Sequence, residues 1–170
     1  MIKEKDTDDI FYDDEDDEDT LKDKYLTFCL GQEEYGIDIK YVIEVIGMQK
    51  ITEVPDVPDF VKGVINLRGQ VIPITDVRMR FKMKPAEYND RTCVVVVKIK
   101  DTQVGLIVDL VSDVIKISED QVQPPPRINQ KEGSRFIQGL GKVDDQVKIL
   151  LNIEKLLYEE ELEKIAAYES

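Results

Sequence analysis

The sequence predicts a mainly β protein with two similar barrel-like halves packed together, preceded by an acidic tail and followed by a C-terminal α-helix. Three observations carry this prediction: short apolar segments at regular spacing, a repeat of the sequence within itself, and a change of charge near residue 24. Many short, evenly spaced strands are typical of small barrels. The 170 residues are 42% apolar, which allows a buried core in one domain or in two very small ones.

The acidic segment comprises residues 1–24. It holds 12 acidic and 4 basic side chains, a net charge of −8 within a chain total of −13. Because this segment has few apolar side chains to bury, folding cannot offset the conformational entropy lost on ordering it. We therefore expect a disordered tail. A solubilising role and a regulatory or intramolecular role both remain open. Because acidic chains are repelled by phosphate groups, nucleic acid and anionic membrane surfaces are poor candidates as partners.

Strand-like segments begin at Tyr25 and are separated by turn signals. The stretch KYVIEVI, residues 40–46, fits either a short helix or an extended bend. Arg68 and Gly69 are expected at the tight turn of a hairpin between two apolar runs. The expected strands are 25–30, 34–39, 61–67, 70–77, 91–100, 103–111, 136–143 and 146–151.

The last segment changes to a helical period. Asn152 can serve as the N-cap of a helix over 152–168. The apolar side chains on or near one face of this helix are Ile153, Leu156, Leu157 and Ile165.

The chain also repeats itself in two registers. A shift of 69 residues aligns Gly36 with Gly105 and Glu44 with Asp113, and a shift of 76 runs for 22 residues without a gap. Paired phenylalanines, glycines and glutamines are harder to obtain by chance than paired aliphatic residues, so we infer a duplication. The second register aligns Phe60, Gly63, Gln70, Val71 and Val77 with Phe136, Gly139, Gln146, Val147 and Ile153. The expected boundaries are 1–24 for the tail, 25–88 and 89–151 for the halves, and 152–168 for the helix.

Several functional classes are disfavoured by what the sequence lacks. The chain has no histidine, hence no imidazole base, zinc ligand or phosphate acceptor. It has no Walker loop, G-x-S-x-G or C-x-x-C motif, no signal sequence, and no apolar run long enough to span a membrane. Cys29 and Cys93 lie in apolar runs and are expected to be reduced residues of a cytoplasmic protein.

The residues alone also allow two other hypotheses. An enzyme could use Asp109 and Asp113 as an acid–base pair, but no other convergent site supports catalysis. The basic run RMRFKMK, residues 78–84, could form a nucleic-acid patch, although a solvated helix or strand edge suits an acidic protein better.

Several segments of the sequence, quoted below, resemble the CheW family, the coupling proteins of bacterial chemotaxis. The resemblance covers nearly the whole chain from Tyr25 to about Leu157, within an expected CheW-like domain at 25–170. The matching segments are EEYGIDI, VIEVI, FVKGVINLRGQVIPITDVRMRF, VGLIVDLVSDV, FIQGLGKV and ILLNIEKLL. The acidic tail lies outside it. The resemblance implies two SH3-like five-stranded β-barrels and a C-terminal helix, with no catalysis and no cofactor.

The resemblance also implies partners. Family members bridge transmembrane methyl-accepting chemoreceptors and the histidine kinase CheA, so this chain is expected to be recruited to receptor arrays at the inner face of the membrane. We expect a stand-alone adaptor, because the 170 residues leave no room for a kinase domain or a receiver domain. An alternative is a CheW-like regulator of a non-chemotactic histidine kinase pathway.

The site residues follow from the matched positions. Arg68 could be an ordinary polar turn residue, but the family has an arginine in this turn that is linked to signalling and often pairs with the residue matching Glu44. For Gly63, the alternative to receptor binding is a backbone conformation that requires glycine. For the apolar residues, the alternative is packing in the core. The receptor-binding set is Val42, Glu44, Val45, Gly63, Arg68, Cys93, Val111 and Val114. The kinase-binding candidates are Val54, Ile72 and Ile74.

Overall fold

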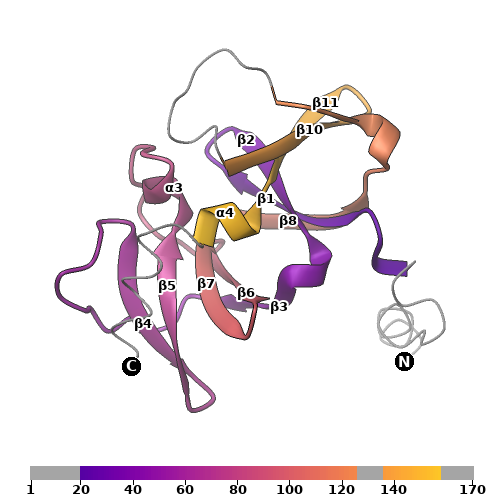
Figure 1. Cartoon of the computed structure of the whole chain (residues 1–170). Helices are drawn as coiled ribbons and strands as arrows, with labels where there is room; N and C mark the ends of the chain where they lie inside the picture. The colour runs from indigo at the N-terminus through magenta and orange to yellow at the C-terminus, as the bar shows by residue number, and fades with distance from the viewer. Residues whose placement is uncertain (1–19, 126–135, 158–170) are drawn as a thin grey trace.

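The computed structural model describes residues 20–125 and 136–157, which form two β-sheets with short helices. Figure 1 shows sheet A at the upper right and sheet B at the lower left, with helix α4 (Ile153–Leu157) between them. Sheet A contains β1 Lys24–Leu30, β2 Glu33–Asp38, β8 Leu110–Lys116, β9 Val122–Gln123, β10 Ile137–Val143 and β11 Gln146–Leu151. Sheet B contains β3 Val42–Gly47, β4 Val61–Leu67, β5 Gln70–Asp76, β6 Cys93–Ile99 and β7 Thr102–Val108. The prediction of a mainly β fold is confirmed.

Neither sheet is made from one half of the sequence. The strand order is β8-β1-β2-β11-β10-β9 in sheet A and β3-β6-β7-β5-β4 in sheet B. Each sheet therefore takes strands from both sides of the boundary predicted near residue 88. A division into units at 25–88 and 89–151 stays a prediction, and the sheets do not follow it.

The duplication is visible in the strand pairing. A shift of 69 residues relates β1, β2 and β3 to β6, β7 and β8, and a shift of 76 relates β4 and β5 to β10 and β11. The two parallel pairs, β5 with β7 and β2 with β11, are equivalent under these shifts. The register also slips at equivalent places, between Val61 and Gly63 in β4 and between Ile137 and Gly139 in β10. The two repeats thus build equivalent sheets by exchanging strands.

A short helix follows the last strand of each repeat, and both are capped in the same way. In α3 (Val77–Arg80) the Asp76 carboxylate accepts a hydrogen bond from the Met79 N–H at 3.2 Å. In α4 the Asn152 amide oxygen accepts one from the Lys155 N–H at 2.9 Å. An oxygen at the N-cap satisfies a donor that the first helical turn leaves free. The predicted N-cap at Asn152 is confirmed, whereas the predicted helix beyond Leu157, including Ile165, lies outside the described residues.

Three clusters of buried apolar side chains stabilise the two sheets. The largest joins both sheets and includes Phe28, Phe136 and Leu157. A second, within sheet B, is built from Ile65, Ile72, Ile74, Val94, Val96 and Ile107. A third and smaller cluster in sheet A contains Tyr25, Ile117 and Leu150. Burial of this apolar area is the main favourable contribution to the folded state.

The structure corrects three expectations. The strand predicted at 103–111 is two strands, because the chain leaves sheet B at Val108 and enters sheet A at Leu110. Sheet A carries a sixth strand, the two-residue β9, where five were expected. The tail was predicted to reach residue 24, but Lys24 already belongs to β1 and the Ile117 N–H donates to the Asp23 carbonyl at 2.8 Å. Residues 1–19 of the predicted disordered tail lie outside the described residues.

The stretch 40–46 contains both of the alternatives left open. A 3-10 turn, η2 (Ile39–Tyr41), is capped by the Asp38 side chain, and the extended strand β3 follows it. The β3 side chains alternate between half-buried and exposed, as expected of a strand at the edge of a sheet.

Candidate functional site

The turn between β4 and β5 places Arg68 at the end of sheet B, as predicted. Arg68 and Gly69 have φ of 52° and 87°, and the Gly69 N–H donates to the Asn66 side chain at 2.8 Å. Two positive φ values define the tight hairpin turn that matches the twist of the flanking strands. The Arg68 guanidinium pairs with the Glu44 carboxylate on β3, and the arginine side chain is 67% exposed. The expected pair is present at the surface, and its role in signalling stays a prediction.

The apolar residues of the predicted receptor set lie on β3, β6 and β8, and so belong to both sheets. Val42, Cys93 and Val111 are partly buried against the cluster that joins the sheets. Val45 and Val114 are 40% and 45% exposed, on β3 and β8. These two strands are equivalent under the 69-residue shift, and each forms one edge of its sheet. The structure therefore offers two equivalent edges, one for each sheet, with partly buried residues behind them.

The backbone conformation at position 63 requires a glycine. Its φ is +141°, and a Cβ added there would lie 2.1 Å from the Thr52 carbonyl oxygen. The Thr52 and Val64 backbones exchange hydrogen bonds of 2.8 and 2.9 Å beside it. A glycine is therefore required for the close approach of these segments, which favours the structural alternative for this residue.

Two of the three kinase-binding candidates belong to the core. Ile72 and Ile74 are 1% and 0% exposed within the sheet B cluster, so their side chains offer no surface to a partner. Val54 is half-buried in the loop between β3 and β4.

The predicted site residues did not include two exposed valines, one next to Ile72 and one at the equivalent position of the second repeat. Val71 on β5 is 55% exposed and Val147 on β11 is 49% exposed. The 76-residue shift pairs the two valines, and strand alternation turns Val71 outward when Ile72 and Ile74 face the core. The repeat and the alternation together could have identified them from the sequence.

The two hairpin ends around these valines differ in charge. At the end of sheet B the turn carries Arg68, and at the equivalent end of sheet A it carries Asp144 and Asp145. Beside Val147 a cleft of about 340 Å³ is lined by Gln32, Glu33, Glu34, Gln146, Val147 and Lys148. Within it Lys148 pairs with Glu34 and donates to the Gln146 side chain at 2.9 Å. The same backbone shape thus carries different charges at its two ends.

Asp109 does not fit the role of a catalytic acid. Arg78 donates to its two carboxylate oxygens at 2.7 and 2.8 Å, and the Gly31 N–H donates to it at 2.8 Å. Burial alone would raise the pKa of Asp109, but these hydrogen bonds outweigh burial and hold the pKa below its usual value. Asp113 is exposed at the sheet edge, where its carboxylate accepts from the Val114 N–H at 2.7 Å. Asp109 instead joins α3 to the β1–β2 turn, at the point where the chain passes between sheets.

The described residues give no sign of a membrane span or a metal site. Within 20–125 and 136–157 no helix is long and apolar enough to cross a membrane. In the same part of the chain no three His, Cys, Asp or Glu side chains come together as metal ligands.

Val45 and Val114 are exposed on the edge strands of the two sheets, where an apolar side chain can contact another protein. The fold and surface therefore fit a protein that binds other proteins. A family model of the CheW-like domain matches residues 24–161, and the chain belongs to that family. It is a chemotaxis adaptor and not an enzyme.

Individual relatives support this family assignment. The chain is 41% identical over 143 residues to a chemotaxis protein CheW of Klebsiella aerogenes, covering 84% of this chain and 86% of that protein. It is 36% identical over 145 residues to a chemotaxis protein CheW of Treponema pallidum, covering 83% and 85%. The crystal structure of the scaffolding protein TtCheW from Thermoanaerobacter tengcongensis is similar with a TM-score of 0.75 and 36% identity, over 81% of this chain and 94% of that one.

Proposed function

We propose that this adaptor couples methyl-accepting chemoreceptors to the histidine kinase CheA through separate surfaces, and that it is recruited to receptor arrays at the inner face of the membrane. The observation that carries the proposal is the pair of equivalent hairpin ends that carry different charged side chains. Val71 and Val147 are exposed at equivalent places, beside Arg68 in one sheet and beside Asp144 and Asp145 in the other. A shared backbone with divergent charges can bind two different partners without competition.

For the receptor we propose the edge of sheet B around β3. This strand exposes Ile43 and Val45 on one face, and Glu44, on the alternate face, pairs with Arg68 along the same edge. Apolar side chains on an edge strand that also carries a fixed charge pair suit a helical hairpin tip, whose apolar face supplies affinity and whose polar groups set register. The pair itself contributes at most about 1 kcal/mol to stability, so its value would lie in orienting the partner.

For the kinase we propose the hairpin end of one sheet, with an exposed valine at its centre. Val71 and Val147 are better candidates than their buried neighbours because an interface anchor must be exposed before binding and buried after it. Val54 stays a candidate for the same contact on the ground of its position in the β3–β4 loop.

The test is a binding measurement with each partner separately. A receptor tip fragment and a CheA regulatory domain are titrated against the parent chain and against Arg68→Ala, Val71→Ser and Val147→Ser. We expect Arg68→Ala to weaken receptor binding with kinase binding kept, and one of the two valine variants to show the reverse. No binding of the parent chain to either fragment would contradict the proposal.

The alternative is a CheW-like regulator of a histidine kinase outside chemotaxis. It would use the same surfaces, so only binding to the receptor distinguishes the two functions. A parent chain that binds a kinase regulatory domain while ignoring chemoreceptor tips would favour this alternative.

A further inference from the structure

Asp109 binds elements of both sheets at the point where the chain passes from sheet B to sheet A. Its backbone N–H donates to the Cys29 carbonyl at 3.2 Å, and its carboxylate accepts from the Gly31 N–H at 2.8 Å. Both of these groups belong to the end of β1 and the turn that follows it. From α3 the Arg78 guanidinium donates to both carboxylate oxygens at 2.7 and 2.8 Å. Two such hydrogen bonds from one planar guanidinium fix the orientation of the carboxylate as well as its charge.

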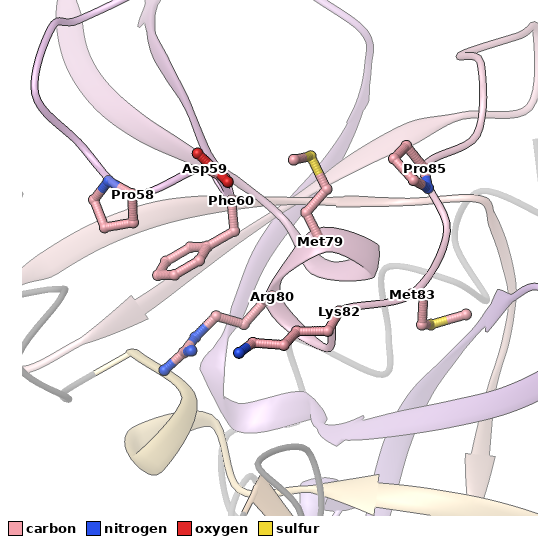
Figure 2. A pocket seen from close by; sticks show the side chains of 8 residues that line it. All are labelled: Pro58, Asp59, Phe60, Met79, Arg80, Lys82, Met83 and Pro85. Carbon is pink, nitrogen blue, oxygen red and sulfur yellow. The ribbon is translucent and has the colours of Figure 1, made fainter.

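Arg78 also fixes the chain that follows α3. Its guanidinium donates to the Lys84 carbonyl at 2.7 Å, and its own carbonyl accepts from the Met83 N–H at 2.8 Å. Figure 2 shows this segment, in which Met83 and Pro85 follow α3 along one side of a cleft of about 450 Å³. The side chains of Arg78 and Asp109 are 17% and 29% exposed, so water and salt screen their attraction only in part.

On the sheet A side, the turn that Asp109 holds forms a wall of the cleft of about 340 Å³ beside Val147, here called the Val147 cleft. Residues 32–34 follow Gly31 directly and line this cleft together with Val147 and Lys148. The strands that carry the two walls, β2 and β11, pair in parallel. A partner that fills the Val147 cleft would therefore contact a turn whose position is set by the Asp109 carboxylate.

On the sheet B side, Arg78 lies close to the receptor edge through one strand. Helix α3 follows β5 without a break, and β5 begins at Gln70, directly after the turn that contains Arg68. Strand β5 is paired with β4 on one side and with β7 on the other, so it lies in the interior of the sheet. Arg78 and the Arg68 turn therefore adjoin the two ends of one internal strand.

The positions of the two exposed valines favour the Val147 end for the kinase. Val71 lies three residues after Arg68 in the same hairpin, so a receptor bound at Arg68 would crowd a kinase domain at Val71. Val147 lies on β11 of the other sheet, away from that hairpin in the strand order. Both partners have room when the kinase takes the Val147 cleft.

We propose that Asp109 is the positioning residue that couples kinase binding at the Val147 cleft to receptor binding at the Arg68 edge. This inference rests on the proposed function, and it adds that the two partners bind with positive cooperativity. A bound kinase holds the β1–β2 turn, the turn holds the Asp109 carboxylate, and the carboxylate holds Arg78 at the end of β5. Each partner thereby lowers the cost of ordering this connection for the other.

Titration of the CheA regulatory domain against the full chain, with and without a saturating receptor tip fragment, tests the coupling. For the parent chain we expect the receptor fragment to lower the Kd of the kinase domain by about fivefold or more. Asp109→Asn leaves one acceptor oxygen for Arg78 and Gly31, so this ratio should fall below about twofold although each partner alone still binds. Asp109→Glu keeps the carboxylate and should restore part of the ratio.

Tyr41→Phe is the matched control, because it removes a hydrogen bond to Glu154 at the equivalent junction. It should keep the parent ratio. Binding of both fragments to the parent chain without cooperativity would overturn this inference and leave the proposed function standing. So would an Asp109→Asn chain that keeps the parent ratio, or an equal loss in Tyr41→Phe. A parent chain that binds neither fragment would overturn the proposed function and this inference together.

Amide exchange of the parent chain supplies a readout that needs no variant. The kinase domain alone should slow exchange at residues 77–84 and 109–114 by about twofold or more, although neither range lines the Val147 cleft. Unchanged exchange in both ranges, with the kinase domain bound, would overturn the inference even if Asp109→Asn failed to fold.

Discussion

Sheets A and B are built from equivalent strands in the same order, yet they bury different side chains. In sheet B the region near the hairpin end is aliphatic, with Ile65 and Ile72 in one cluster. The shift of 76 residues places Gly141 and Lys148 at the equivalent positions of sheet A. One sheet is held there by apolar packing and the other partly by an ion pair.

The junctions between the sheets differ in the same manner. Arg78 and Asp109 form a multiply hydrogen-bonded pair at one junction. The equivalent positions are Glu154 and Lys40, where the Tyr41 hydroxyl donates to Glu154 at 3.3 Å. A duplicated backbone therefore constrains strand order and turn shape, while its core and surface charges can diverge. The proposed use of two equivalent surfaces for different partners depends on this freedom.

The largest expected effect concerns the two equivalent glycines of β4 and β10. Gly63→Ala forces a Cβ to within 2.1 Å of a carbonyl oxygen at positive φ, whereas a Cβ at Gly139 meets a valine methyl at 2.7 Å. We expect Gly63→Ala to lower the free energy of unfolding by about 3–5 kcal/mol and Gly139→Ala by about 1–2 kcal/mol. Urea unfolding measures both, and equal losses would show that the two bulges are under the same constraint.

A second comparison tests the two cores. Ile72→Ala should cost about 2–5 kcal/mol because it leaves a cavity in an aliphatic cluster. At the equivalent place in sheet A, Lys148→Ile combined with Glu34→Gln installs the residues of sheet B. Replacing a buried ion pair in this way is often neutral or stabilising by about 1–4 kcal/mol. Thermal and urea unfolding of both variants decide this, and a large loss in the double variant would mean that the ion pair is required for the fold of sheet A.

A third comparison tests the two junctions. Asp109→Asn should cost about 1–2 kcal/mol at pH 7, because it removes charge-assisted hydrogen bonds from a half-buried arginine. Tyr41→Phe at the other junction should cost about 0.5–1 kcal/mol.

The acid dependence of the same carboxylate supplies a further check. The pKa of Asp109 is lowered in the folded state, so its contribution is fully present above the unfolded value of about 3.9 and is lost as pH falls through the folded value. Urea titrations from pH 6 to pH 2 should therefore converge for the parent chain and Asp109→Asn at the acid end. A constant difference across this range would assign the effect to packing instead of charge.

The smallest expected effect on folding is at the exposed turns. Arg68→Ala and Asp144→Ala should each change the free energy of unfolding by less than about 1 kcal/mol, because both side chains lie at the surface. Only Arg68→Ala should weaken receptor binding. An unfolded Arg68→Ala protein, or one that signals normally in a chemotaxis assay, would contradict the role given to this arginine.

Much of the fold was open to prediction because it depends on local pattern. The hairpin turn at Arg68 and Gly69, the N-cap at Asn152 and the repeat registers follow from residue types at fixed spacing. The sites were harder. Ile72 and Ile74 belong to the core and Val71 to the surface, a difference of one residue in register that apolar content alone cannot resolve.

The sequence by itself determined most of the strands, the hairpin turn at Arg68 and Gly69 and the duplication, since each depends on neighbours along the chain. Only the tertiary structure decided which strands share a sheet. The chain changes sheets at Asp109, inside an apolar run that would suit one long strand, and the exchange of strands becomes visible only when β1 and β2 pair with β8 and β11. Pairing between strands far apart in sequence depends on how whole sheets bury their faces, and no local pattern encodes that choice.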